Sequence, residues 1–111
     1  MNTAKKIHAP HELMPSAPIH PGEMLKDELE ARGMSQRKFA GIINMPYTAF
    51  NEIINGKRPI TTDTALKIEA ATGISANIWV GLQSDYNIQT ARKDSKLSAI
   101  LENIRKAVAV L

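Results

Sequence analysis

A short polar helix face near the middle of the chain carries side chains suited to recognising DNA bases. After Pro46 the apolar residues Phe50, Ile53 and Ile54 recur at helical spacing, which turns the polar residues between them to the opposite face. Such side chains match base edges in the major groove: Asn pairs with adenine, Glu accepts from the cytosine amino group, and the Thr methyl contacts the thymine methyl. The candidate base-reading residues are Tyr47, Thr48, Asn51 and Glu52.

Basic residues flank this polar face. Residues 35–60 contain four Lys or Arg and a single acidic residue, Glu52, in a chain whose net charge is +3. Cations here would attract phosphates regardless of base sequence, with an affinity that falls as salt rises. Glu52 costs energy near phosphates unless it meets a cytosine or pairs with Arg or Lys. The phosphate-contacting candidates are Gln36, at the start of a predicted helix where free N–H groups also bind phosphate, and Arg37, Lys38, Lys57 and Arg58.

A helix-turn-helix is needed to present this face, and the sequence predicts one over residues 35–55. Ser35 is a good N-cap for a first short helix, and residues 44–46 interrupt its apolar period. A second helix follows at once and ends at Asn55-Gly56. Ala40 is small where the two helices must cross. The apolar face predicted for the first helix is Phe39, Ala40, Ile42 and Ile43.

Further helices are predicted on both sides, and no strand pattern competes with them. One begins at Pro21 and runs to about Arg32; another is capped by Thr61 or Thr62 and stopped by Gly73; a third follows Ser75. The chain is therefore predicted to be all-α. The core candidates are Phe39, Ile42, Phe50, Ile53 and Trp79, with Ala65, Leu66, Ile68 and Ala70 on one flanking helix and Ile78, Leu82 and Tyr86 on the next.

A last helix, beginning near Asp94 and Ser95, carries a narrow apolar seam. Its members stand at spacings of four, three, four and three, as in helices that pack against a partner helix. The seam has three possible roles: it packs back on its own domain, joins two chains, or receives a protein partner. The seam residues are Leu97, Leu101, Ile104, Val108 and Leu111.

The first twenty residues are predicted to form an extended or disordered arm, because they contain three prolines and no helical apolar period. His8, His11 and Glu12 suggest a zinc site, but their order matches no zinc-protease motif, so we interpret all three histidines, His20 included, as ordinary tail residues. No metal site and no cofactor is predicted.

Bulk properties limit the remaining possibilities. The 111 residues fit one compact domain with tails, which we divide into an arm (1–20), a helix-turn-helix domain (21–88) and a C-terminal amphipathic helix (89–111). The chain has no cysteine, no membrane-length apolar run and no secretory signal, so we expect a cytoplasmic protein with no membrane association. No nucleophile–base pair or phosphate-binding glycine loop is present, so no catalytic residue and no enzymatic activity is predicted.

Residues 35–57, SQRKFAGIINMPYTAFNEIINGK, resemble the Cro/C1-type (XRE) helix-turn-helix family. The flanking segments IHPGEMLKDELEARGMSQ and INGKRPITTDTALKIEAATG, together with Trp79, extend the resemblance over residues 19–88 to the HigA (VapI-like) antitoxins. This chain has Trp-Val-Gly-Leu-Gln at 79–83, where that family more often has Trp-Leu-Asn-Leu-Gln. The resemblance implies a five-helix lambda-repressor-like domain, here with an extra C-terminal helix and an extended N-terminal arm.

The same resemblance implies an antitoxin that neutralises an RNA-cleaving toxin and, as a homodimer on double-stranded operator DNA, represses its own operon. Carried over by position, the phosphate-gripping sites fall on Gln36, Asn55 and Lys57, and the groove-reading sites on Tyr47, Thr48, Asn51 and Glu52. Three alternatives stay open: a solitary transcription regulator without a toxin, a protein-interaction module that has lost DNA binding, and an enzyme.

Overall fold

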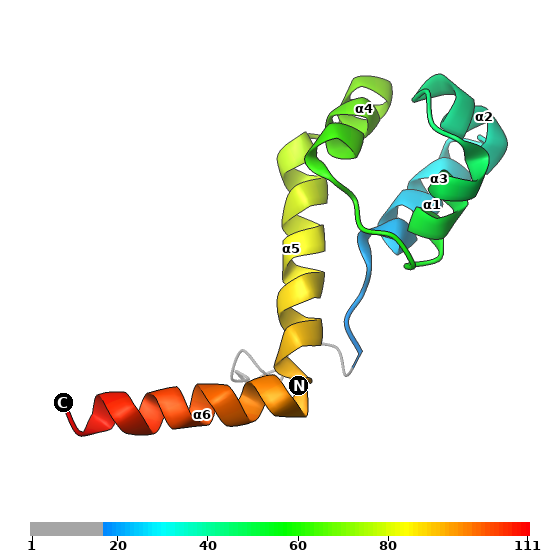
Figure 1. The fold of residues 1–111 in the computed structure, drawn as a ribbon. Helices are drawn as coiled ribbons and strands as arrows, with labels where there is room; N and C mark the ends of the chain where they lie inside the picture. Colours follow the sequence, from blue (N-terminus) through cyan, green and yellow to red (C-terminus); the bar gives the residue numbers. More distant parts are fainter. Residues whose placement is uncertain (1–16) are drawn as a thin grey trace, which may run out of the picture.

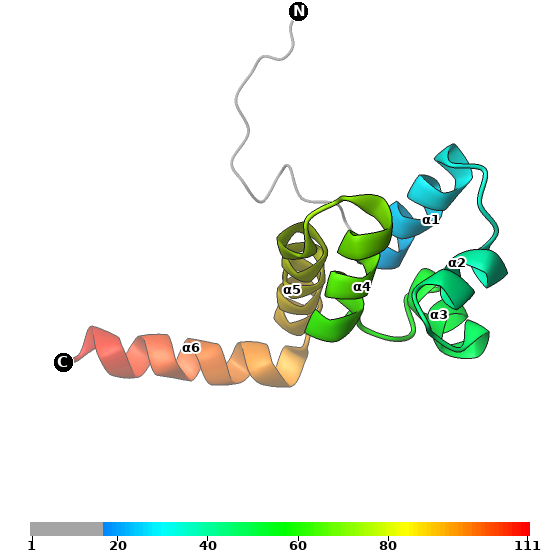
Figure 2. The ribbon, with the colours of Figure 1, turned by 90° about the horizontal axis from the view of Figure 1, so that it is seen from above.

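The computed structural model describes residues 17–111, which form six helices and no strand (Figure 1). The all-α class predicted from the sequence is confirmed. Five helices make up the body, and Figure 2 shows α4 and α5 lying between the projecting α6 and the group formed by α1, α2 and α3. The helices are α1 (Pro21–Ala31), α2 (Gln36–Ile42), α3 (Tyr47–Ile54), α4 (Thr62–Thr72), α5 (Ala76–Arg92) and α6 (Ser95–Ala109).

The predicted helix starts are capped by side chains. Ser35 Oγ accepts from Lys38 N at 3.1 Å, and Thr61, Ser75 and Asp94 cap α4, α5 and α6 in the same way. Each side-chain oxygen satisfies an N–H group that has no partner within its helix. One boundary differs from the expectation: α5 continues without a break to Arg92, past residue 88, where the sequence analysis ended the domain.

The core is built from one face of each helix of the body. Trp79 is fully buried, and the rings of Phe39 and Phe50 lie 5.5 Å apart between α2 and α3. The indole Nε1 of Trp79 has no hydrogen-bond partner among the described residues. The buried apolar residues are Leu25, Leu29, Phe39, Ala40, Ile43, Phe50, Ile53, Ile54, Ile60, Ala65, Ile68 and Trp79.

Four predicted apolar positions are instead exposed. On α2 the buried side chains are Phe39 and Ala40, followed by Ile43 at the C-cap; Ile42 lies to one side of that arc and is 53% exposed. Helical spacing alone places a residue within a broad face, whereas burial depends on the narrower arc that a neighbouring helix covers. The exposed residues that were assigned to apolar faces are Ile42, Leu66, Ala70 and Ile78.

His20 is not a tail residue, which corrects the expectation. It is 5% exposed, and its Nδ1 accepts from Gly22 N at 3.0 Å, so its side chain is the N-cap of α1. The next two residues, Pro21 and Gly22, are also buried. His20 therefore belongs to the helical body rather than to a tail. His8, His11 and Glu12, for which no zinc site is predicted, lie outside the described residues.

α1 and α3 pack closely because Gly22 has no side chain. A Cβ built at Gly22 would overlap the carbonyl oxygen of Ile53 and lie 2.9 Å from its carbonyl carbon. These atoms belong to the backbone of α3, which a rotamer change cannot move. Gly22 thus fixes where the start of α1 crosses the end of α3.

α6 projects from the body and buries none of its residues. The radius of gyration is 18.2 Å, compared with about 13 Å for a compact domain of some 100 residues. Leu97 and Leu101 are half-buried near the junction with α5, while the outer members of the seam are exposed. Packing of the whole seam on its own domain is therefore not what the structure shows. The exposed members are Ile104, Val108 and Leu111.

The described residues, 17–111, offer neither a membrane-length apolar helix nor a cluster of metal ligands. None of the helices there has the length and apolar character needed to cross a membrane. No group of three or more His, Asp or Glu residues in this part of the chain is arranged to hold a metal ion.

Candidate nucleic-acid interface

The turn between α2 and α3 is formed by a residue in the left-handed conformation. Asn44 has φ 57°, which Asn tolerates better than other non-glycine residues, and Met45 N donates to Ala40 O at 2.9 Å. Pro46 then precedes α3 directly. Because the connection spans only residues 43–46, α3 has a fixed orientation against α2.

α3 turns its polar residues away from the core. Phe50 and Ile53 are fully buried and Ile54 is 5% exposed, so the opposite face of this short helix lies at the surface. Thr48 is exposed, and the other three base-reading candidates are half-buried. The structure therefore brings Tyr47, Thr48, Asn51 and Glu52 together on one face.

Asn51 connects the two helices of the motif. Its Nδ2 donates to Gln36 Oε1 at 3.2 Å, and its Oδ1 accepts from Asn55 Nδ2 at 3.0 Å. A side-chain amide has two N–H donors and two acceptor lone pairs, so one of each remains. These are the donor and the acceptor that a bidentate contact with adenine requires. Asn51 is thus held in place while one donor and one acceptor of its amide stay unused by these two bonds.

Arg37 covers the ring of Tyr47. Its guanidinium carbon lies 4.0 Å from the ring centroid, within the range of a cation–π interaction. The contact joins the first turn of α2 to the first turn of α3. Arg37 itself is exposed, so its N–H groups are accessible at the edge of the candidate face.

Glu52 is paired with Arg58. Arg58 Nε and Nη2 both donate to Glu52 Oε1, at 2.9 and 2.7 Å. This pairing meets the condition under which a carboxylate is tolerated beside phosphates, namely a cationic partner. The side chains of Arg58 and Glu52 are 48% and 41% exposed, so the pair contributes little to stability. The negative charge of Glu52 therefore neutralises part of the positive charge of Arg58.

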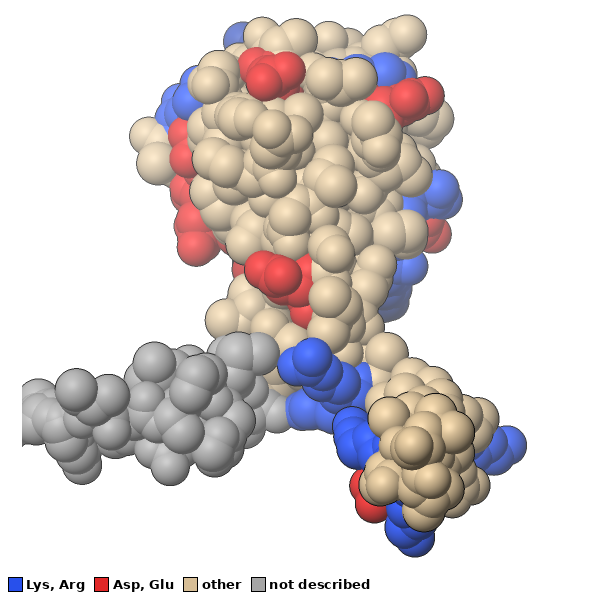
Figure 3. Space-filling view, turned by 90° about the vertical axis from the view of Figure 1, so that its left-hand side faces the viewer, with Lys and Arg blue, Asp and Glu red and all other residues tan. Residues whose placement is uncertain are grey.

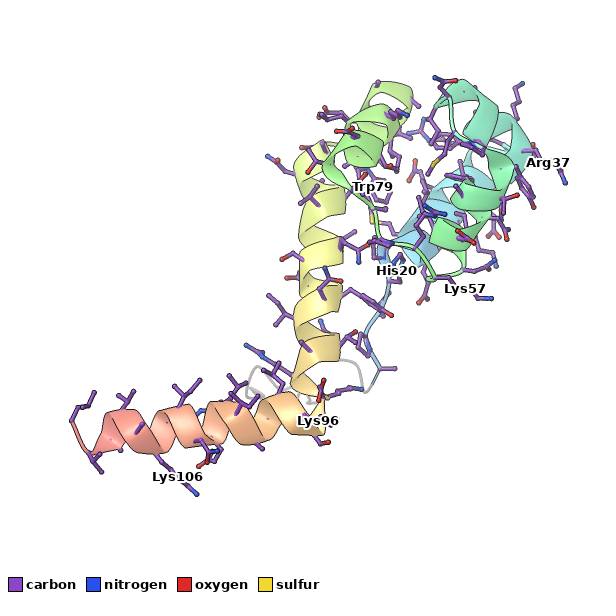
Figure 4. The ribbon with its side chains drawn as sticks, viewed as in Figure 1. His20, Arg37, Lys57, Trp79, Lys96 and Lys106 are labelled. Atoms are coloured by element: carbon purple, nitrogen blue, oxygen red, sulfur yellow. The ribbon has the colours of Figure 1, made fainter. Side chains whose placement is uncertain are left out.

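Cations surround the candidate face. Figure 4 places Arg37 and Lys57 on the side of the molecule that points away from α5 and α6. Lys38, Asn55 and Lys57 are all exposed there. A separate group of basic residues gathers around α6 and its junction with α5, as Figure 3 shows; it consists of Arg92, Lys93, Lys96, Arg105 and Lys106.

Two buried polar residues hold the loop behind Lys57, and the sequence analysis gave neither of them a role. Gln83 of α5 is 6% exposed and accepts from Ile60 N at 2.8 Å through its Oε1. His20 lines the hollow behind the loop together with Arg58 and makes an edge contact with Tyr86, at 4.8 Å between ring centroids. Gln83 could have been suspected, because it stands one helical turn after Trp79 on the buried face. The role of His20 depends on residues distant in sequence.

Burial lowers the pKa of His20 below its ordinary value of 6.5, and this effect outweighs the hydrogen bond with Arg58 and the nearby Glu23 carboxylate, which favour the charged form. The neutral ring is also the form whose Nδ1 accepts from Gly22 N. Protonation therefore competes with the cap of α1.

We expect acid to destabilise the protein through His20. Because the pKa is lower in the folded state, the unfolded chain takes up the proton first. The free energy of unfolding should be constant above about pH 7, fall as the pH drops below 6.5, and level off below the folded pKa. Urea unfolding between pH 5 and 8 measures this. His20→Asn keeps a side-chain cap and should flatten the curve; an unchanged curve in that variant would contradict the assignment.

Comparison with known proteins adds independent observations. Residues 25–79 match the model of a helix-turn-helix family. Virulence-associated protein I of Dichelobacter nodosus is 35% identical over 79 residues, which are 70% of this chain and 73% of that protein.

Two solved structures are also similar. An addiction module antidote protein of a HigA family from Coxiella burnetii has a TM-score of 0.70 and 38% identity, over 78% of this chain and 95% of that one. The Pseudomonas aeruginosa antitoxin HigA, solved with the higBA promoter, has a TM-score of 0.67 and 33% identity, over 78% of this chain and 90% of that one.

Proposed function

Because this chain belongs to the HigA (VapI-like) family of helix-turn-helix proteins, we propose that it is an antitoxin that neutralises an RNA-cleaving toxin and binds operator DNA to repress its own operon. The observation that carries the DNA-binding part is the polar face of α3, held by Asn51 and edged with cations. A relative with 33% identity was solved with promoter DNA, which supports the same use of this fold.

In the proposed complex, the residues on and around the polar face of α3 make two kinds of contact with DNA. Tyr47, Thr48, Asn51 and Glu52 read base edges in the major groove, and the residues around them hold phosphates. Asn51 is the strongest reader, because it keeps a donor and an acceptor after its two internal hydrogen bonds. The proposed phosphate contacts are Gln36, Arg37, Lys38, Asn55, Lys57 and Arg58.

α6 supports the proposal of a homodimer or a toxin complex. Its apolar seam runs from Leu97 to Leu111 and is exposed over its outer part. Exposed apolar side chains at the spacing of a helix-pairing seam favour burial against another chain. A dimer would place two α3 helices on half-sites about one helical turn, roughly 34 Å, apart.

Binding to DNA from the chain's own promoter region, measured over a salt series, tests the proposed function. If Arg37, Lys38, Lys57 and Arg58 each neutralise one phosphate, log K should fall against log salt with a slope of about −3 to −4 per bound chain. A scrambled duplex of equal length serves as the control and should bind more weakly with a similar slope. Absence of binding at low salt, or binding without a salt slope, rejects the DNA-binding role.

The second candidate function is a solitary transcription regulator with the same DNA-binding face. Co-expression with the neighbouring reading frame distinguishes the two. A basic protein that co-purifies with this chain and stops growth when expressed alone supports the antitoxin. If the neighbouring frame encodes no such protein, the solitary regulator is the better assignment.

A further inference from the structure

The loop that follows α3 is fixed by hydrogen bonds rather than by close packing. Lys57, Arg58 and Pro59 are exposed. Behind them is a hollow of 250 Å³ lined by the loop and by His20, Gln83 and Tyr86, among others. Only Ile60, at the end of the loop, is buried in the core. Apolar contacts therefore give residues 57–59 little support. Lys57 N donates to Glu52 O at 2.8 Å and the Arg58 guanidinium donates to the Glu52 carboxylate, so these bonds tie the loop to α3 on one side only.

Two buried side chains, one at the start of α1 and one on α5, hold the 57–60 loop against the body. His20 lies at the start of α1, between α5 and the loop (Figure 4), and its side chain packs against the loop: a Cβ at Gly56 would lie 3.6 Å from it, and Arg58 lines the same hollow. Gln83 accepts from Ile60 N at 2.8 Å, and its own Nε2 donates to Asn87 Oδ1 at 3.0 Å. The Asn87 contact orients the Gln83 amide so that its oxygen faces the loop.

We propose that His20 and Gln83 are positioning residues that hold the 57–60 loop where Lys57 and Arg58 contact DNA phosphates. The proposal rests on the DNA-binding function proposed above and extends it to two residues that touch no DNA. It also makes phosphate contact depend on α5, because Gln83 and Tyr86 belong to that helix.

Three variants separate positioning from general stability. Gln83→Met keeps the side-chain length and volume while removing the bond to Ile60 N. His20→Asn keeps a cap for α1 but is too short to reach Arg58. Ser84→Ala is the matched control, because Ser84 is exposed on the same helix, next to Gln83, and the substitution leaves the Ile60 bond and its Asn87 support in place.

Amide hydrogen exchange tests the loop without DNA. The Ile60 amide should exchange faster in Gln83→Met than in the wild-type chain, and at the wild-type rate in Ser84→Ala. DNA affinity over a salt series, measured well below each melting temperature, tests the consequence. Gln83→Met and His20→Asn should bind about tenfold more weakly, with a salt slope flatter by about 1 to 2.

A variant that combines substitutions of Gln83 and of the two cations distinguishes positioning of the cations from a general effect of Gln83 on stability. The measured quantity is the DNA affinity. If Gln83 acts through the two cations, adding Gln83→Met to Lys57→Ala/Arg58→Ala should cause little further loss of DNA affinity. An additive loss, or a wild-type salt slope in Gln83→Met, overturns the positioning role while the DNA-binding function stands. If the wild-type chain itself binds no promoter DNA, the proposed function fails, and the positioning role fails with it.

Discussion

Gly22→Ala is expected to destabilise the protein by about 3 kcal/mol or more, at the upper end of the cost of overpacking. The added methyl group would overlap the carbonyl oxygen of Ile53, and relief requires α1 and α3 to separate. Small domains are stable by only about 5–15 kcal/mol, so much of the folding free energy would be lost. Urea or thermal unfolding measures the change, and DNA binding should weaken with it because α3 carries the candidate face.

A second glycine provides the control for this experiment. Gly81 lies in the interior of α5, and a Cβ there would meet nothing within 4 Å. Gly81→Ala should therefore stabilise the protein by about 0.5–1 kcal/mol, since alanine loses less backbone entropy in a helix. Equal effects of the two substitutions would show that the contact between α1 and α3 is looser than described.

Asn51→Ala is expected to weaken binding to the specific operator by about 1–3 kcal/mol, roughly 5- to 150-fold, while binding to random DNA changes little. The substitution removes the remaining donor and acceptor of the amide and releases Gln36 and Asn55 from their shared partner. Competition binding with specific and scrambled duplexes measures the discrimination.

Lys57→Ala is the matched comparison, because its loss should lower affinity for both duplexes alike and reduce the salt slope by about 1. The two variants therefore separate base reading from phosphate attraction. If Asn51→Ala lowers the affinity for both duplexes equally, the base-reading residue lies elsewhere on α3.

Local features of this fold were predictable from the sequence, because they depend on neighbouring residues. The N-cap at Ser35, the break at Asn44 and the polar face around Asn51 all follow from patterns within one helical turn. The exposed position of Ile42 was not predictable in this way, because the face that α2 buries is determined by its packing against α3.

The positioning contacts were not predictable for the same reason. Gln83 meets Ile60 across 23 residues, and Gly22 meets the α3 backbone across 31. A single sequence carries no record of such distant pairs. His20 shows the difficulty most clearly, since its proline-rich surroundings favour a tail whereas its ring is enclosed by α1, α5 and the loop.

The burial of Trp79 provides a spectroscopic probe. It is the single tryptophan of the chain, it is fully buried, and it lies on α5, away from the α3 face. With no described hydrogen-bond partner at Nε1, the indole is in an apolar environment that gives blue-shifted fluorescence. Its emission should shift to the red on unfolding and stay nearly constant when a duplex binds α3. Intrinsic fluorescence can thus verify that each variant is folded in the same cuvette in which its DNA affinity is measured.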